Sequence, residues 1–144
     1  MAARFSPKDL LVGRRADQWG ETVIELKDIE DWTVATLTWL DADRVAIEMR
    51  GGLSFIVEPS GRAGKEATLW RDDRSGESLC LYSAPSTYLH SGPALEISGH
   101  DVLQRGDPVG RLVPRRGGLL LLLPPSVPDP IRAFVFAMEC RRFR

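Results

Sequence analysis

The stretch Gly117–Arg144, GGLLLLLPPSVPDPIRAFVFAMECRRFR, decides the fold of this chain. It predicts a leucine strand over Leu119–Leu123, a connector stiffened by prolines, and a short helix over residues 129–143. Asp129 is a good N-cap residue, and Pro130 suits the first helical position, where a missing N–H costs nothing. Residues 130–143 would form about 21 Å of helix.

Apolar side chains cover almost the whole circumference of this predicted helix. They recur at helical spacing on one face and on the opposite side: Ile131, Phe134, Val135 and Met138, then Ala133, Phe136, Ala137 and Cys140. A helix of this kind needs protein on every side. A membrane span needs roughly 20 unbroken apolar residues, whereas four prolines and Asp129 separate the leucine run from the helix. We therefore expect a buried core helix and no transmembrane segment.

Size and composition indicate one globular domain over residues 1–144, with residues 1–8 as a loose lead-in. The chain has 144 residues and is 43% hydrophobic, which suffices for a single core. The N-terminus MAARFSPKDL lacks the apolar core of a signal peptide. Cys80 and Cys140 both sit in apolar runs, so we expect free buried thiols, with a disulfide as the alternative. A reducing cytoplasm fits this composition best.

Charge is unevenly distributed along a chain whose net charge is −1. Residues 1–16 carry four basic groups and one acidic group (+3), and residues 17–104 carry seven basic and sixteen acidic groups (−9). Residues 105–144 carry eight basic and three acidic groups (+5). If the two ends of the chain meet, one pole of the domain is basic and the remainder acidic.

The region before the C-terminal stretch predicts about ten or eleven short strands joined by hairpin-length turns. Turn residues such as Asp41-Ala42-Asp43, Gly51-Gly52 and Gly106-Asp107-Pro108 separate them. Pro85–Pro93 is the longest segment that we expect to be irregular. The expected strands are Asp9–Val12, Glu21–Lys27, Trp32–Leu40, Arg44–Met49, Leu53–Glu58, Glu66–Arg71, Glu77–Ser83, Ala94–Ile97, Val102–Arg105, Val109–Val113 and Leu119–Leu123.

This pattern is typical of a mainly β protein built as an antiparallel meander. One arrangement is a closed or nearly closed barrel or roll with the C-terminal helix inside it. A barrel would also remove the exposed edges that make a strand such as Leu119–Leu123 prone to aggregation. The alternative is an open sheet with the helix across one face.

Several segments have the form of a strand, an Asp/Gly turn and a second strand: VEPSGRAGKEATLW, WRDDRSGESLCLY and VLQRGDPVGRLVPR. The last of these, followed by LLLLLPPSVPDPIRAFVFAMEC, resembles the end of tubby C-terminal-like domains, a group that includes tubby, LURP-one-related and phospholipid-scramblase-like proteins. The resemblance is one of pattern and covers Leu53–Phe143. It implies an antiparallel barrel that encloses a hydrophobic C-terminal helix.

The same resemblance implies a function, because tubby proteins bind phosphoinositides through basic side chains on the barrel wall. The candidates here are Arg105, Arg111, Arg115 and Arg116, with Arg14 and Arg15 as possible neighbours. Arginine forks match the geometry of a phosphate group. The alternative is that these are solvated turn residues that keep an apolar protein soluble.

Catalytic and metal-binding constellations are weak in this sequence. Cys80, His90 and His100 could be read as a thiol–imidazole system, but an apolar strand should raise the pKa of Cys80 and make the thiol inert. Asp41-Ala42-Asp43 and Asp72-Asp73 lack the other ligands of a calcium loop and fit turns better. We therefore expect no enzyme, no cofactor and no metal site.

We thus expect a cytoplasmic binding or adaptor domain, with an anionic lipid headgroup as its ligand. The alternative is a protein–protein interaction subunit that uses Trp19, Trp32 or Trp39 as exposed anchors. Nucleic-acid binding is disfavoured by the negative net charge and by the lack of a basic exposed helix. A small molecule in the barrel lumen is disfavoured because the helix would already fill it.

Overall fold

A computed structural model describes residues 10–15, 22–60, 65–72, 75–115, 118–123 and 126–140. The predicted lead-in over residues 1–8, Trp19, Arg116 and residues 141–143 of the predicted helix lie outside these ranges. The described ranges contain twelve strands and one helix: β1 Leu10–Arg15, β2 Val23–Lys27, β3 Thr33–Trp39, β4 Val45–Met49, β5 Ser54–Pro59, β6 Glu66–Arg71, β7 Ser78–Ser83, β8 Thr87–Leu89, β9 Leu95–Ser98, β10 Asp101–Gln104, β11 Asp107–Arg115, β12 Gly118–Leu122 and α1 Asp129–Glu139.

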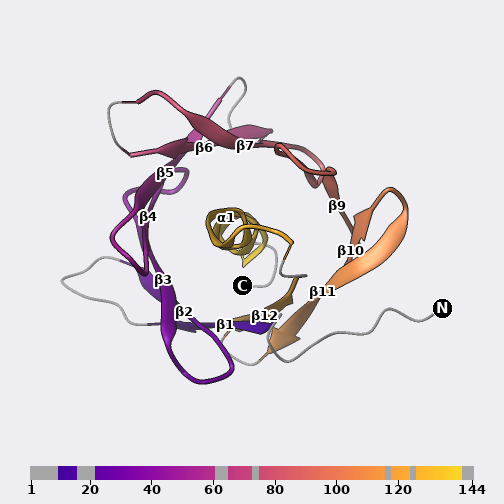
Figure 1. Ribbon diagram of the computed structural model, residues 1–144, viewed down its shortest axis with the longest axis horizontal. Coiled ribbons are helices and arrows are strands. Elements are labelled where there is room, and N and C mark those ends of the chain that lie inside the picture. The colour runs from indigo at the N-terminus through magenta and orange to yellow at the C-terminus, as the bar shows by residue number, and fades with distance from the viewer. Residues whose placement is uncertain are drawn as a thin grey trace.

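The strands form one closed antiparallel barrel in which each strand pairs with its neighbours in sequence, and β12 pairs with β1. Figure 1 looks along the barrel, with α1 inside the ring of strands. The predicted fold class, a mainly β antiparallel meander closing around a C-terminal helix, is therefore confirmed. Of the two arrangements considered, the closed barrel is the one found.

Burial of α1 explains why the barrel closes around it. Its apolar residues from Ile131 to Ala137 are at most 3% exposed. Phe136 reaches β1 at Gly13, where an added Cβ would lie 2.1 Å from the Cζ atom of the ring. Phe134 meets the ring of Tyr88 edge-on, with the ring centroids 5.7 Å apart. The helix is thus packed against opposite parts of the wall.

Two polar side chains of the helix are also buried, and both are paired. Arg132 donates from Nε to the carbonyl of Val127 (3.1 Å) and from Nη2 to the carbonyl of Leu123 (2.8 Å). These carbonyls belong to the connector between β12 and α1. At the other end of the helix, the Tyr88 hydroxyl donates to Oε2 of Glu139. Burial, reinforced by the charge of Glu139, raises the pKa of Tyr88 well above its ordinary value.

The structure corrects four local expectations. Thr87–Leu89 forms β8 inside the segment predicted to be irregular, and Asp107-Pro108 belongs to β11 rather than to a turn, since Asp107 pairs with Gln104. The helix is capped by Pro128, with no side-chain hydrogen bond, and Asp129 lies in its first turn. Trp39 is only 8% exposed, so it cannot serve as a surface anchor.

The two ends of the barrel differ in the turns and strand ends that they hold. The Trp32 end holds the β2–β3 and β4–β5 turns and the start of β1. The Arg115 end holds the end of β11 and the start of β12. Because β12 runs toward the Trp32 end, α1 begins there and runs through the lumen toward the Arg115 end.

Changing Gly13 to Ala should lower the free energy of unfolding by about 1–3 kcal/mol, the usual cost of overpacking a core. Phe136→Leu in the same chain should recover part of this loss, because it removes the ring that the new methyl group meets. Phe134→Leu should not recover it, since that ring packs on Tyr88. Urea unfolding of the double-mutant cycle measures the coupling, and purely additive losses for Gly13→Ala with Phe136→Leu would contradict this packing.

Candidate functional site

The predicted arginine group does not form a single patch. Arg105, Arg111 and Arg115 are all exposed. Arg105 lies in the β10–β11 turn at the Trp32 end with a φ of 53°, whereas Arg115 ends β11 at the other end, about 30 Å away at strand spacing. Arg111 lies between them, with its Nε 4.0 Å from Oδ1 of Asp101. Arg116 lies outside the described residues.

The register of the closing strands brings Arg115 near Arg14 instead. Arg115 is opposite Gly118 on β12, and Val12 of β1 is opposite Leu120. Continuing the β1–β12 register by two residues places Arg14 opposite Gly118. Arg14 on β1 and Arg115 on β11 therefore flank Gly118 from the two neighbouring strands. Two strand spacings amount to about 10 Å, so the backbones of Arg14 and Arg115 lie about this far apart across β12. Both arginines are exposed on the outer wall.

Apolar residues on the outer wall extend from this arginine pair toward the Trp32 end. Val12, Leu120 and Val113 form the next row across β1, β12 and β11, and Leu10 and Leu122 pair in the row beyond. A groove of about 370 Å³ runs beside β1, between Arg14 and the β2–β3 turn, with Leu10, Val12 and Ile29 among its lining residues. The outer wall therefore places Arg14 and Arg115 at one end of an apolar strip, with Glu25 opposite Arg14 on β2 and Arg111 opposite Leu122 on β11.

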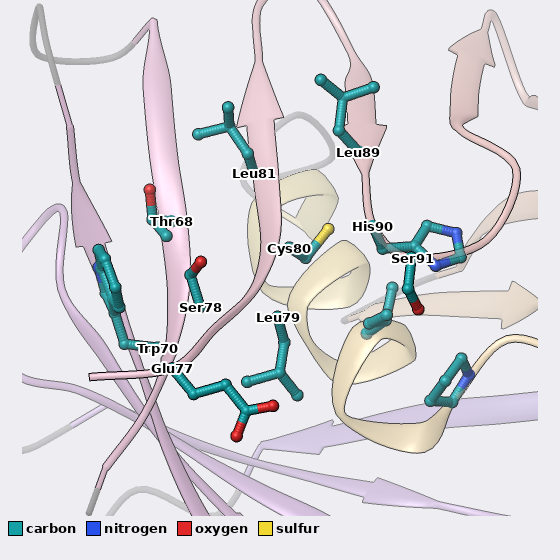
Figure 2. A pocket seen from close by; sticks show the side chains of 12 residues that line it. Thr68, Trp70, Glu77, Ser78, Leu79, Cys80, Leu81, Leu89, His90 and Ser91 are labelled. Atoms are coloured by element: carbon teal, nitrogen blue, oxygen red, sulfur yellow. The ribbon is translucent and has the colours of Figure 1, made fainter. Parts of the chain in front are cut away.

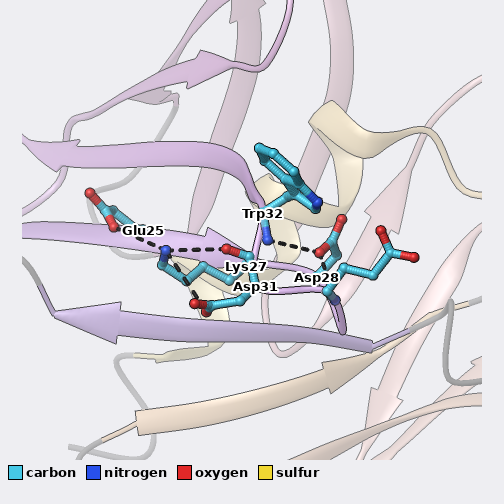
Figure 3. A network of polar contacts seen from close by, with 6 residues as sticks. Glu25, Lys27, Asp28, Asp31 and Trp32 are labelled. Atoms are coloured by element: carbon cyan, nitrogen blue, oxygen red, sulfur yellow. Dashed lines mark hydrogen bonds and ion pairs between the residues drawn. The ribbon is translucent and has the colours of Figure 1, made fainter.

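The charged side chains at the end of β2 and in the β2–β3 turn form ion pairs and hydrogen bonds within this region, as Figure 3 shows. Lys27 Nζ lies 3.8 Å from Oε2 of Glu25 and 3.9 Å from Oδ1 of Asp31. Oδ1 of Asp28 accepts hydrogen bonds from the backbone N–H groups of Glu30 and Trp32, both at 3.0 Å. Lys27 therefore adds little to a cationic site, although it lines the same groove.

The β2–β3 and β4–β5 turns together carry an exposed apolar tip, which consists of Ile29, Trp32 and Leu53. These side chains are 54%, 62% and 49% exposed. Leu53 belongs to the neighbouring β4–β5 turn, and Nη1 of Arg50 in that turn lies 3.7 Å from Oδ2 of Asp28. Among the three tryptophans considered as anchors, Trp32 is thus the one that the structure exposes, while Trp39 is buried and Trp19 is outside the described residues.

Cys80 and His90 line a common cleft of about 600 Å³ in the barrel wall, which Figure 2 shows. Burial raises the pKa of Cys80 to about 12, so the thiol is protonated at neutral pH, as predicted for an inert cysteine. Nδ1 of His90 accepts a hydrogen bond from the N–H of Gly92 at 3.2 Å. His100 lies elsewhere, with Nδ1 3.2 Å from the carbonyl oxygen of Leu112. These residues do not form a nucleophile–base pair.

Metal-ligating side chains do not gather anywhere in the part of the chain that the structure describes: no group of three or more His, Cys, Asp or Glu residues could hold an ion. Asp41 instead stabilises its own turn, since Oδ1 accepts from the N–H groups of Asp43 (2.9 Å) and Arg44 (2.8 Å). Over the same described ranges, no helix combines the length and the hydrophobicity that a membrane span requires.

Comparison with known proteins gives no relative from which a function could be transferred. No protein-family model, curated protein or solved structure matches this chain.

The free energy of unfolding should fall in alkaline solution because the buried thiol of Cys80 resists ionisation in the native state. Because the folded pKa of about 12 exceeds the ordinary value of 9.0, the native state is favoured below pH 9 and loses this advantage as the pH rises toward 12. Wild type should therefore lose more stability than Cys80→Ala between about pH 8 and pH 10.5. Urea unfolding at the two pH values tests this, with Cys140→Ala as the matched control. Equal losses in wild type and Cys80→Ala would contradict it.

Proposed function

We propose that this barrel is a non-enzymatic binding domain for anionic, phosphate-bearing lipid headgroups, held by Arg14 and Arg115 on the outer wall. The observation that carries the proposal is the register across β1, β12 and β11, which sets two exposed arginines on either side of Gly118. Guanidinium groups donate paired hydrogen bonds that match phosphate oxygens. The apolar strip beside them suits a ligand whose headgroup is attached to an apolar chain.

The architecture adds support to this proposal. A closed antiparallel barrel around an apolar C-terminal helix is the arrangement that the resemblance to tubby C-terminal-like domains implies. In that group the ligand lies on the barrel wall, and here too the lumen is filled by a helix, which leaves the outer wall as the place for a ligand. Membership of that group is part of the proposal.

A cytoplasmic location belongs to the same proposal. Anionic lipids concentrate in the cytoplasmic leaflet. Cys80 and Cys140 are free thiols, the state that a reducing compartment maintains.

Removing the arginine pair should weaken headgroup binding. Co-flotation with neutral liposomes, with and without phosphoinositide, tests this at about 50 and 150 mM salt, because attraction between exposed charges weakens as salt rises. Arg14→Ala with Arg115→Ala should lower the affinity about tenfold or more, the result of losing charge-assisted hydrogen bonds. Arg44→Ala with Arg50→Ala removes the same charge elsewhere and should change the affinity less than about twofold.

Two results would contradict the headgroup site. Equal losses in both double variants would mean that net charge alone attracts the protein to the membrane. Absence of phosphoinositide-dependent flotation at either salt concentration would mean that the outer wall binds no headgroup.

A second function, protein–protein interaction, is favoured by the apolar tip of Ile29, Trp32 and Leu53. Large apolar side chains that project from adjacent turns are typical anchors of interfaces. The acidic groups around the tip, Asp28, Glu30 and Asp31, would complement a partner with a basic rim.

If the apolar tip anchors a partner protein, Trp32→Ser should abolish the capture of that partner, because the aromatic ring supplies most of the apolar contact. Affinity purification at physiological salt, followed by identification of the retained proteins, measures this. Arg14→Ala with Arg115→Ala should retain the same partner. If Trp32→Ser retains every protein that wild type captures, the tip is not an interface.

A further inference from the structure

The cleft that contains Cys80 marks an interruption in the barrel wall. Pairing between β7 and β8 covers only three residues of each strand and stops at Leu81 and Leu89. Over Ser78–Cys80, the described part of β7 therefore pairs with β6 alone. On the other side of the cleft, the chain leaves β8 at His90 and turns away through Ser91. Figure 2 shows this opening, with α1 behind it.

A β-bulge in β7 lies at the same place. In the β6–β7 register, Leu69 is opposite Cys80 and Trp70 is opposite Ser78, so Leu79 has no partner residue on β6. Leu79 has none on β8 either, because that ladder begins at Leu81. Backbone N–H and C=O groups of a strand project toward both of its neighbours. The side of β7 that faces the cleft thus offers strand-like backbone without a cross-strand partner.

The walls of the cleft fit a short extended chain. The floor is formed by Pro128 and Ile131 at the start of α1, and the opposite wall by His90 and Ser91. Its volume of about 600 Å³ lies within the range of clefts that bury small ligands. Leu81 and Leu89 lie directly opposite each other at one end of the cleft and are 36% and 48% exposed.

The charge of the residues that line the cleft indicates which kind of peptide segment it can bind. Glu77 is the single charged side chain among the described residues that line the cleft. Its carboxylate lies 3.6 Å from Nη1 of Arg71 at the surface. Arg71 offsets part of this charge, so the mouth of the cleft is weakly acidic. A segment with apolar and neutral or basic side chains therefore complements it better than an acidic segment does.

We propose that the cleft between β7 and His90–Ser91 binds an extended, apolar and neutral-to-basic peptide segment of a partner protein, which pairs with β7 at Leu79 and completes the wall. This is recognition by strand addition, in which main-chain hydrogen bonds provide affinity and alternate side chains provide specificity. Side chains on one face of the segment would lie on Ile131, and those on the other would lie beside Leu81 and Leu89. The proposal does not depend on Arg14 or Arg115.

The test uses the full isotope-labelled chain and a capped hexapeptide, acetyl-Thr-Val-Lys-Val-Thr-Val-amide, titrated to about 1 mM while backbone amide resonances are recorded by NMR. Saturable shifts should appear at Leu79, His90 and Ser91. The same peptide with its central amide nitrogens methylated keeps its side chains but cannot pair as a strand, so it should bind about tenfold more weakly.

Two variants locate the binding. Ser91→Trp places a large ring in the cleft and should weaken the hexapeptide about tenfold or more. Ser98→Trp introduces the same ring at an exposed position of β9, toward the Arg115 end, and should leave the affinity within about twofold of wild type.

Three outcomes would overturn the proposal. Equal binding of the methylated peptide would mean that the cleft accepts apolar groups without strand pairing. Absence of shifts at Leu79 and Ser91 up to about 1 mM would mean that it accepts no extended chain. Shifts at these residues that follow protein concentration without peptide would identify a second copy of this chain as the occupant.

Discussion

Phe136 meets the wall of the barrel at Gly13, where the ring fills the space that a side chain on β1 would need. This contact fixes the position of α1 across the lumen, and Phe134 against Tyr88 fixes it on the other side. The interior is therefore a packed core and not a ligand cavity. Because an apolar helix of this kind is unstable in water by itself, the barrel and the helix depend on each other.

Polar groups hold the helix along its axis as well. Near its start, Arg132 satisfies two carbonyls of the connector, and near its end Glu139 accepts from Tyr88. Buried charges are costly unless they are paired, so sliding α1 by even one turn would break both sets of contacts. The two buried polar residues thus specify one position for a helix whose apolar surface alone would tolerate several.

The architecture could be predicted from the sequence because its signals are local. Apolar residues around the whole helix require enclosure, and glycine or aspartate turns separate most strands. The errors lie where local signals were weak: β8 has three residues between Pro85 and Pro93, and Trp39 ends a strand whose two faces are both half apolar. The nearness of Arg14 to Arg115 could not be predicted, since it depends on the register between the first and last strands. Nor could the cleft, since it depends on a bulge at Leu79.

Enclosure of the helix has a consequence for function. With the lumen full, recognition is left to the outer wall, to the turns and to places where the wall is incomplete. Closure of the barrel creates the arginine pair on the outer wall. It sets β1 beside β12 and thereby brings a basic N-terminal strand to the basic end of β11. The short strand β8 creates the cleft in the wall, because its three residues cannot pair with all six residues of β7. The arginine pair and the cleft therefore both follow from how the described strands, which differ in length, close around α1.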